Sequence, residues 1–133
     1  MKNIIKDWLK FADDDIKAAN SILKDNEYGD GYINTGAVVF HCQQAIEKYF
    51  KGFLIENGWE LQKTHNLNFL YNEILKIKDL SLDINFIKEI YERYERYEKV
   101  RYPGDYYPPT EEEAREYYKF ALEVKSKIEQ ELK

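Results

Sequence analysis

The chain has 133 residues, of which 44% are hydrophobic and 34% are charged, and its formal net charge is −5 at pH 7. This length suits one domain, so we expect a single helical domain over residues 1–133. The acidic balance argues against generic binding to a nucleic-acid backbone, which normally needs a basic face. The single cysteine cannot form an internal disulfide, no apolar run approaches the ~20 residues that span a bilayer, and the N-terminus lacks a signal-peptide core. We therefore expect a cytoplasmic protein with no membrane association.

The first predicted helix runs from about Asn3 to Lys24, where apolar side chains recur at helical spacing. Asp15 fills a gap in that apolar stripe. A carboxylate placed against apolar surface is partly desolvated and needs a partner. Two interpretations stay open for Asp15: a structural ion pair or hydrogen bond between helices, or an acid at a ligand site.

The second predicted helix spans Tyr32 to Asn57, with Asp30 as a plausible N-cap and Gly58 as the C-terminal stop. It carries two apolar stripes side by side, so we expect it to be the central helix, packed on more than one side. The first stripe consists of Val38, Cys42, Ala45, Tyr49 and Phe53. The second consists of Val39, Ile46, Phe50 and Leu54.

The polar side chains of this helix fall on one side and are called the polar strip: His41, Gln44, Glu47, Lys48 and Lys51. Gln43 lies instead within the second apolar stripe. A buried amide must be hydrogen-bonded, so we expect Gln43 to bridge helices, with a ligand contact as the alternative. The expected structural polar groups of the core are Asp15, Gln43, Gln44 and Glu47.

Two more helices follow the connector after the central helix. Asn66 can cap a third helix that ends near Ile77, and Ser81 can cap a fourth that begins near Leu82 and ends before Pro103. The Tyr-Glu-Arg repeat of the fourth helix pairs acids with bases at i,i+4, which is typical of a solvated helix surface.

The last predicted helix runs from about Glu111 to Leu132, and Thr110 with Glu113 forms a capping-box pattern at its start. The sequence contains no strand pattern longer than four residues. We therefore predict an all-α fold, an antiparallel up-and-down bundle of four long helices plus one shorter helix.

Motifs for the common catalytic and metal sites are absent from the sequence. Neither His41 nor His65 follows a glutamate by three residues, as a di-iron bundle requires, and no zinc-ligand spacing occurs. The chain has no phosphate-binding loop, dinucleotide fingerprint or nucleophile elbow. His41 and Cys42 point about 100° apart on a helix, so they form no dyad. We therefore predict no catalytic residues, no metal site and no cofactor.

Four segments in this order resemble the HEPN domain, a small helical domain of bacteria and archaea that often occurs with a minimal nucleotidyltransferase. The resemblance covers nearly the whole chain. It rests on Trp8, Ala12, Asp15 and Ala19, on the run from Gln43 to Lys51, on Lys63 to Leu67, and on Arg101-Tyr102-Pro103. The resemblance implies the same up-and-down bundle and a homodimer.

Many HEPN proteins are ribonucleases that carry an arginine followed, after four to six residues, by a histidine. This chain departs from that pattern, because Tyr106, Tyr107 and Pro108 occupy the corresponding positions after Arg101 and no histidine follows His65. Metal-independent RNA cleavage needs a general base and stabilisation of charge at the phosphate. The resemblance therefore implies the other branch of the family, a non-catalytic companion of a nucleotidyltransferase that binds nucleotide or substrate.

Our leading hypothesis is a dimeric HEPN module, toxin–antitoxin-like or substrate-binding, whose basic groups hold a nucleotide phosphate while a tyrosine stacks on the base. The candidate binding residues are Lys48, Lys51, Lys63, His65, Arg101 and Tyr102. A structural alternative is that Lys48 and Arg101 only neutralise Asp15 and Glu47. Two further alternatives are a metal-independent ribonuclease that uses His65 or Tyr106 as its base, and a purely structural dimerisation partner.

Overall fold

The computed structural model describes residues 2–24, 33–98 and 108–133, with backbone alone for 94–98. All regular secondary structure in these ranges is helical, which confirms the all-α prediction. The elements are α1 (Asn3–Lys24), α2 (Thr35–Glu56), α3 (Leu67–Leu75), α4 (Ile84–Glu98) and α5 (Glu111–Glu131). Four are long and α3 is short, as the sequence pattern predicts.

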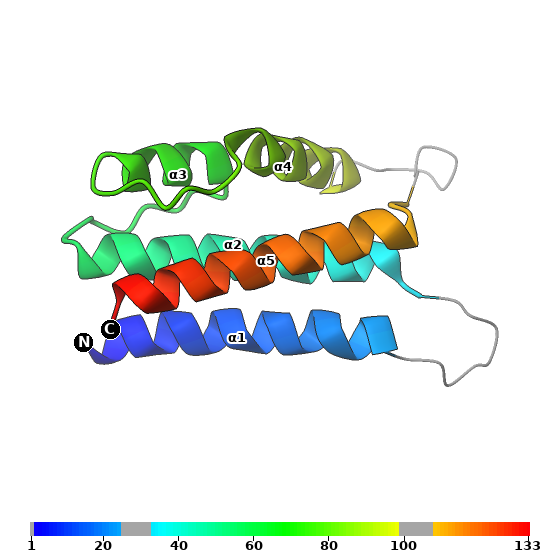
Figure 1. Cartoon of the computed structure of the whole chain (residues 1–133), viewed down its shortest axis with the longest axis horizontal. Coiled ribbons are helices and arrows are strands. Elements are labelled where there is room, and N and C mark those ends of the chain that lie inside the picture. Colours follow the sequence, from blue (N-terminus) through cyan, green and yellow to red (C-terminus); the bar gives the residue numbers. More distant parts are fainter. Residues whose placement is uncertain (1, 25–32, 99–107) are drawn as a thin grey trace.

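The helices form an up-and-down bundle around α2 (Figure 1). Helices α1 and α4 run in one direction, while α2 and α5 run in the other (Figure 1). α2 contacts each of the other four helices, and its largest interface is with α1. α3 and α4 lie end to end along one side of α2 (Figure 1). The prediction that α2 is the central helix is therefore confirmed.

Both apolar stripes of α2 are buried, which explains its position in the bundle. Every member of the first stripe (from Val38 to Phe53) and of the second stripe (from Val39 to Leu54) lies within the hydrophobic core. On the side toward α3, the rings of Phe50 and Tyr71 stack with their centroids 5.7 Å apart. The hydroxyl of Tyr71 also accepts a hydrogen bond of 3.1 Å from the backbone N–H of Leu82, which ties the segment after α3 back to that helix.

The ends of three helices follow the expected capping chemistry. The side chain of Asn66 accepts a hydrogen bond from the backbone of Phe69 at the start of α3. Thr110 and Glu113 form the capping box of α5 in both directions. Gly58, just after α2, has φ +87°, a left-handed conformation that glycine adopts without steric cost.

Three predictions about helix ends were wrong. The N-cap of α2 is Asn34, whose side chain accepts from the backbone N–H of Ala37; Asp30 precedes this cap and lies outside the described residues. At α4, the carboxylate of Asp83 accepts the first backbone N–H groups, whereas Ser81 lies in the preceding turn with φ 58°. α3 ends at Leu75 rather than near Ile77, and Ile77 is exposed. Asparagine and aspartate cap helices as well as serine does, so residue type alone does not show which of several nearby residues is the N-cap.

The α1–α2 contact is close at Gly52, and this position gives a first prediction. A Cβ at Gly52 would lie 3.4 Å from Trp8 Cβ and 3.5 Å from Leu9 Cδ2, which is ordinary van der Waals contact. We expect Gly52→Ala to raise the free energy of unfolding by roughly 0.5 kcal/mol, because glycine inside a helix costs about that much relative to alanine. Gly52→Leu should instead destabilise the protein by overpacking the interface. Urea unfolding of both variants tests this. If Gly52→Ala lowers the free energy of unfolding, the α1–α2 interface does not accept a methyl group at this position.

Candidate functional site

Asp15 of α1 is the centre of an ion-pair network with two residues of the polar strip. Its Oδ2 lies 2.5 Å from the Nζ of Lys48, and its Oδ1 lies 2.9 Å from the Nδ1 of His41. Only 12% of the Asp15 side chain is exposed. The structure thus contains an ion pair between helices of the kind that the structural interpretation of Asp15 predicts. We call Asp15, His41 and Lys48 the Asp15 triplet.

Glu47 of α2 forms a second network with the same composition. Its Oε1 lies 2.8 Å from the Nδ1 of His65, in the connector between α2 and α3, and its Oε2 lies 3.3 Å from the Nζ of Lys51. The side chains of Glu47 and Lys51 are each 5% exposed. The Lys51 ammonium also lies 5.9 Å from the centroid of the Trp8 ring, within range of a cation–π interaction. We call Glu47, His65 and Lys51 the Glu47 triplet.

The two triplets place one lysine and one imidazole on each carboxylate, and both include residues of the polar strip of α2. Glu47 and Lys48, which are consecutive residues, belong to different triplets. An ionised carboxylate only accepts hydrogen bonds, so Nδ1 of each histidine must carry the proton and donate it. This fixes the neutral tautomer of His41 and His65, in which Nδ1 carries the proton and Nε2 does not. Proteins often orient a catalytic or metal-binding imidazole by a hydrogen bond from its Nδ1–H to a carboxylate.

The structure brings together only part of the predicted site. Lys48, Lys51 and His65 belong to the triplets, while Lys63 is exposed on the connector. Arg101 and Tyr102 lie outside the described residues, as does Tyr106, so the part that they were predicted to play stays a prediction. Gln44, on the polar strip, is half-buried.

The structure shows the predicted burial of Gln43 but no hydrogen bond from its side chain among the described residues. The side chain is fully buried, as expected, but neither its amide nitrogen nor its amide oxygen has a hydrogen-bond partner among the described residues. Gln43 lies seven residues before Phe50 and therefore on the same side of α2, where Phe50 packs on Tyr71 of α3. The apolar stripe correctly predicts its burial; it contains no information about which groups the neighbouring helices present there.

His41 was missed as a candidate site residue. A signal was available, because His41 lies seven residues before Lys48 on the polar strip and therefore on the same side of the helix. The two side chains share the carboxylate of Asp15. A cation and a histidine two turns apart can both reach one acid on a neighbouring helix.

A third polar cluster joins α1, α2 and α5 and was not foreseen. Asp13 accepts hydrogen bonds from the hydroxyl of Tyr49 and, at 2.7 Å, from the Nζ of Lys125, which also pairs with Glu129. Burial, and then the hydrogen bond to Asp13, raises the pKa of Tyr49 far above its ordinary value. Burial alone would lower the pKa of Lys125, but its bonds to Asp13 and Glu129 raise it overall. Asp13 and Lys125 are 112 positions apart, so this cluster fastens α5 to the first two helices.

Cys42 gives a prediction about alkaline pH. Burial, and to a lesser extent the charge of Asp15, raises the pKa of the Cys42 thiol from 9.0 to about 12. The unfolded chain therefore loses this proton first, so the stability contributed by the neutral thiol is present below about pH 9 and is lost as pH rises toward 12, at about 1.4 kcal/mol per pH unit. Urea unfolding from pH 8 to pH 11 should show a steeper loss for the native chain than for Cys42→Ala. Equal slopes would refute the assignment.

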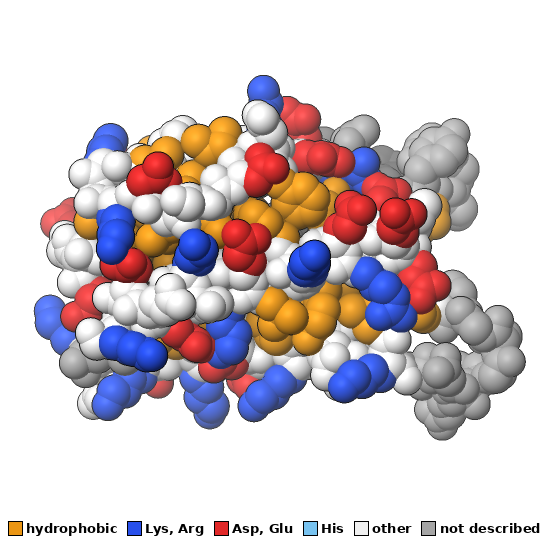
Figure 2. Space-filling view, in the orientation of Figure 1, with side chains coloured by type: hydrophobic (Ala, Val, Ile, Leu, Met, Phe, Trp, Pro, Cys, Tyr) orange, Lys and Arg blue, Asp and Glu red, His pale blue; other side chains and the backbone are white. Residues whose placement is uncertain are grey.

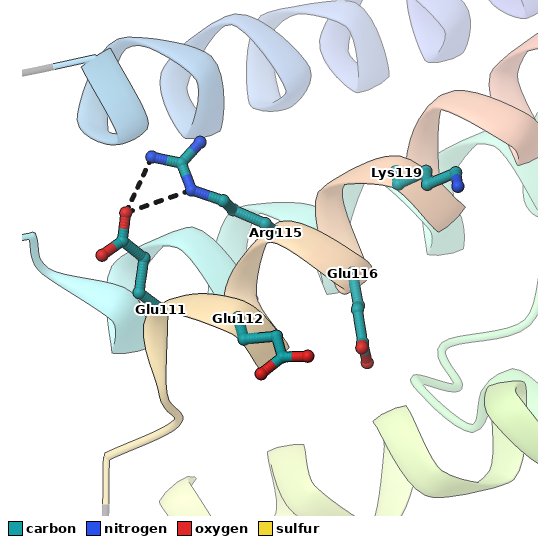
Figure 3. Close-up of a pocket in the computed structure, with 5 residues that line it drawn as sticks. All are labelled: Glu111, Glu112, Arg115, Glu116 and Lys119. Atoms are coloured by element: carbon teal, nitrogen blue, oxygen red, sulfur yellow. Dashed lines mark hydrogen bonds and ion pairs between the residues drawn. The ribbon is translucent and has the colours of Figure 1, made fainter.

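Other surfaces of the described chain offer weaker candidates for a site. A hollow of about 550 Å³ at the start of α5 is lined by Glu111, Glu112, Arg115, Glu116 and Lys119 (Figure 3). Its arginine is already held by Glu111 at 2.9 Å, and it contains none of the predicted site residues. Figure 2 shows basic and acidic side chains interspersed over the face that α5 crosses. Among the described residues, no three His, Cys, Asp or Glu side chains are grouped as a metal site would need, and no helix could cross a bilayer.

Comparison with known proteins identifies the family. The family model of the HEPN domain matches residues 5–131. A protein of Methanocaldococcus jannaschii named "Putative toxin MJ1304" is 30% identical over 118 residues, which cover 82% of this chain and 72% of the relative. The crystal structure of ST0689, an archaeal HEPN homologue, matches with a TM-score of 0.67 and 24% identity over 100% of both chains, a likeness that shows the fold. The chain therefore belongs to the HEPN domain family.

Proposed function

We propose that this HEPN protein is a non-catalytic, cytoplasmic, dimeric module that binds a nucleotide through its phosphate and acts as the companion of a minimal nucleotidyltransferase. Family membership and the relative named as a toxin support a toxin–antitoxin-like pair. The observation that carries the binding role is the concentration of lysines and histidines in the two triplets. Their residues come from α1, α2 and the connector, and both triplets include side chains of the polar strip of α2.

Direct binding measurements test the nucleotide role. Isothermal titration of the full chain with ATP, GTP and a short RNA should give heat with at least one of the nucleotides at millimolar concentration or below. The variant Lys48→Gln should weaken binding by at least about tenfold, since a hydrogen bond to a charged group contributes about 1.5–3 kcal/mol. Lys88→Gln removes an exposed cation from α4 and is the matched control. Absence of heat with every ligand would eliminate nucleotide binding.

The companion role needs a separate measurement. A nucleotidyltransferase encoded beside this chain should co-purify with it when the two are expressed together, and light scattering should show the chain alone as a dimer. If neither complex forms, the role in a two-protein system is excluded.

The ribonuclease alternative has one supporting observation, the hydrogen bond of 2.8 Å between the Nδ1 of His65 and Glu47. A carboxylate in that position orients an imidazole to act as a base through Nε2. Incubation of RNA with the native chain and with His65→Ala separates the alternatives. Cleavage that the substitution abolishes would favour the enzyme, whereas RNA that stays intact after long incubation would exclude it.

A further inference from the structure

One face of α1 carries large apolar side chains that the rest of the chain covers only in part. α1 lies at an outer edge of the bundle and packs against α2 and α5 (Figure 1). Ile4 is 53% exposed and Phe11 is 54% exposed. Trp8, Ala18 and Ile22, on the same side of the helix, are half-buried. This face therefore presents apolar surface along the whole length of α1.

The spacing of these residues is that of a stripe that packs against a second helix. Together with Asp15 they recur at alternating intervals of four and three positions, and we call them the outer stripe: Ile4, Trp8, Phe11, Asp15, Ala18 and Ile22. Asp15 is only 12% exposed, and its carboxylate is already paired with Lys48 of the same chain. The outer stripe can therefore pack against another helix without burying an unpaired charge.

The outer stripe is complementary to itself when two copies of α1 run antiparallel. Reversal about its centre gives three pairs between the copies, Ile4 with Ile22, Trp8 with Ala18, and Phe11 with Asp15. The largest side chain of the stripe then meets the smallest, as interdigitating side chains require. The centre of these pairs lies at position 13, close to the middle of α1, so the two helices overlap over nearly their whole length of about 33 Å.

The exposed charges beside the outer stripe favour the same arrangement. They alternate in sign along one flank of α1, in the order Asp7, Lys10, Asp14 and Lys17. Reversal of the second helix brings Asp7 toward Lys17 of the other copy, and Lys10 toward Asp14. These charge pairs are offset from the apolar pairs by two residues, about 3 Å along the axis, which a lysine side chain can span. Opposite charges that meet across a helix contact favour that pairing.

We propose that α1 packs antiparallel on α1 of a second copy of this chain, about a two-fold axis near the middle of the outer stripe. The inference rests on the dimer of the proposed function and deepens it, because it names the face and the register at which the copies meet. A two-fold contact uses the same surface on both copies, so that surface must be complementary to itself. The outer stripe and its charged flank meet this requirement.

Light scattering of the full chain over a range of protein concentrations tests the face. The native chain should be a dimer, and Phe11→Asp should be a monomer, because the new carboxylate would lie opposite Asp15 of the other copy. Phe11 is 54% exposed, so the substitution leaves the core of each copy intact, which circular dichroism checks. Ile84→Asp on α4 is the matched control, since Ile84 is 48% exposed, and it should stay dimeric.

Cross-linking with a short bismaleimide tests the register. The double variant Ile4→Cys, Ile22→Cys should be joined into covalent dimers, because the pairing places each new thiol opposite the other type in the second copy. Within one chain these positions are 18 residues apart, about 27 Å along the helix, which is too far for the reagent. Ile4→Cys alone should not cross-link, because the two copies of this position lie at opposite ends of the contact. Cys42 is fully buried and does not compete.

The inference requires both results. If the native chain is a dimer but Phe11→Asp stays dimeric, or if the double variant does not cross-link better than Ile4→Cys alone, the inference is overturned and the dimer of the proposed function is left intact. A native chain that is monomeric at every concentration would overturn the inference and that dimer together. Nucleotide binding is measured separately by calorimetry and is affected by neither outcome.

Discussion

Replacing Lys51 with methionine is expected to lower the free energy of unfolding by about 3 kcal/mol, because it leaves a buried carboxylate without its lysine. The Nζ of Lys51 lies 3.3 Å from Oε2 of Glu47, and both side chains are 5% exposed. Methionine keeps an unbranched stem near Trp8, so the substitution removes the charge with little loss of packing. Urea unfolding followed by far-ultraviolet circular dichroism gives the change.

The double variant Lys51→Met, Glu47→Gln is the control for this experiment. It removes both charges, and it should recover a large part of the lost stability because the cost arises from the uncompensated carboxylate rather than from the missing lysine. If the single variant loses less than about 1 kcal/mol, His65 alone is sufficient to compensate Glu47. The Glu47 triplet would then not be a structural unit.

Phe50→Ala is expected to destabilise the protein by about 3–5 kcal/mol, the range for removing a buried aromatic side chain. Phe50 is fully buried on α2, and its ring stacks on that of Tyr71 with centroids 5.7 Å apart. The substitution removes the stacking and leaves a cavity between α2 and α3, which the two helices can close only in part. The midpoint of urea unfolding measures the loss.

Phe40→Ala on the same helix is the matched control, because 44% of Phe40 is exposed. Its cost should be about 1 kcal/mol or less, as for most surface substitutions. Similar losses for the two variants would contradict the assignment of Phe50 to the core and of Phe40 to the surface.

The features of the fold that follow from apolar residues recurring every three to four positions could be predicted from the sequence. The stripes of α2 define a helix with partners on several sides, and Asp15 stands out because it interrupts the stripe of α1. The pairing of Asp15 with Lys48 was proposed as the structural alternative, and the structure contains that ion pair. Periodicity works here because it follows directly from helix geometry.

Contacts between distant elements could not be predicted in the same way. Asp13 lies near the start of the chain and Lys125 near its other end, and no local pattern connects them. The Glu47–His65 bond depends on the path of the connector, and the environment of Gln43 depends on which groups the neighbouring helices present to it. Periodicity gives the face of a helix; it does not give the register at which two helices meet.

The position of α5 bears on how the chain acquires its structure on the ribosome. α5 packs against both α1 and α2, and it supplies buried residues such as Val124 and Ile128. The ribosome synthesises α5 after the other four helices. The hairpin of α1 and α2 therefore emerges with the apolar face that α5 later covers exposed to water. That nascent hairpin offers a transient binding surface for chaperones, and translation pauses ahead of α5 would prolong its exposure.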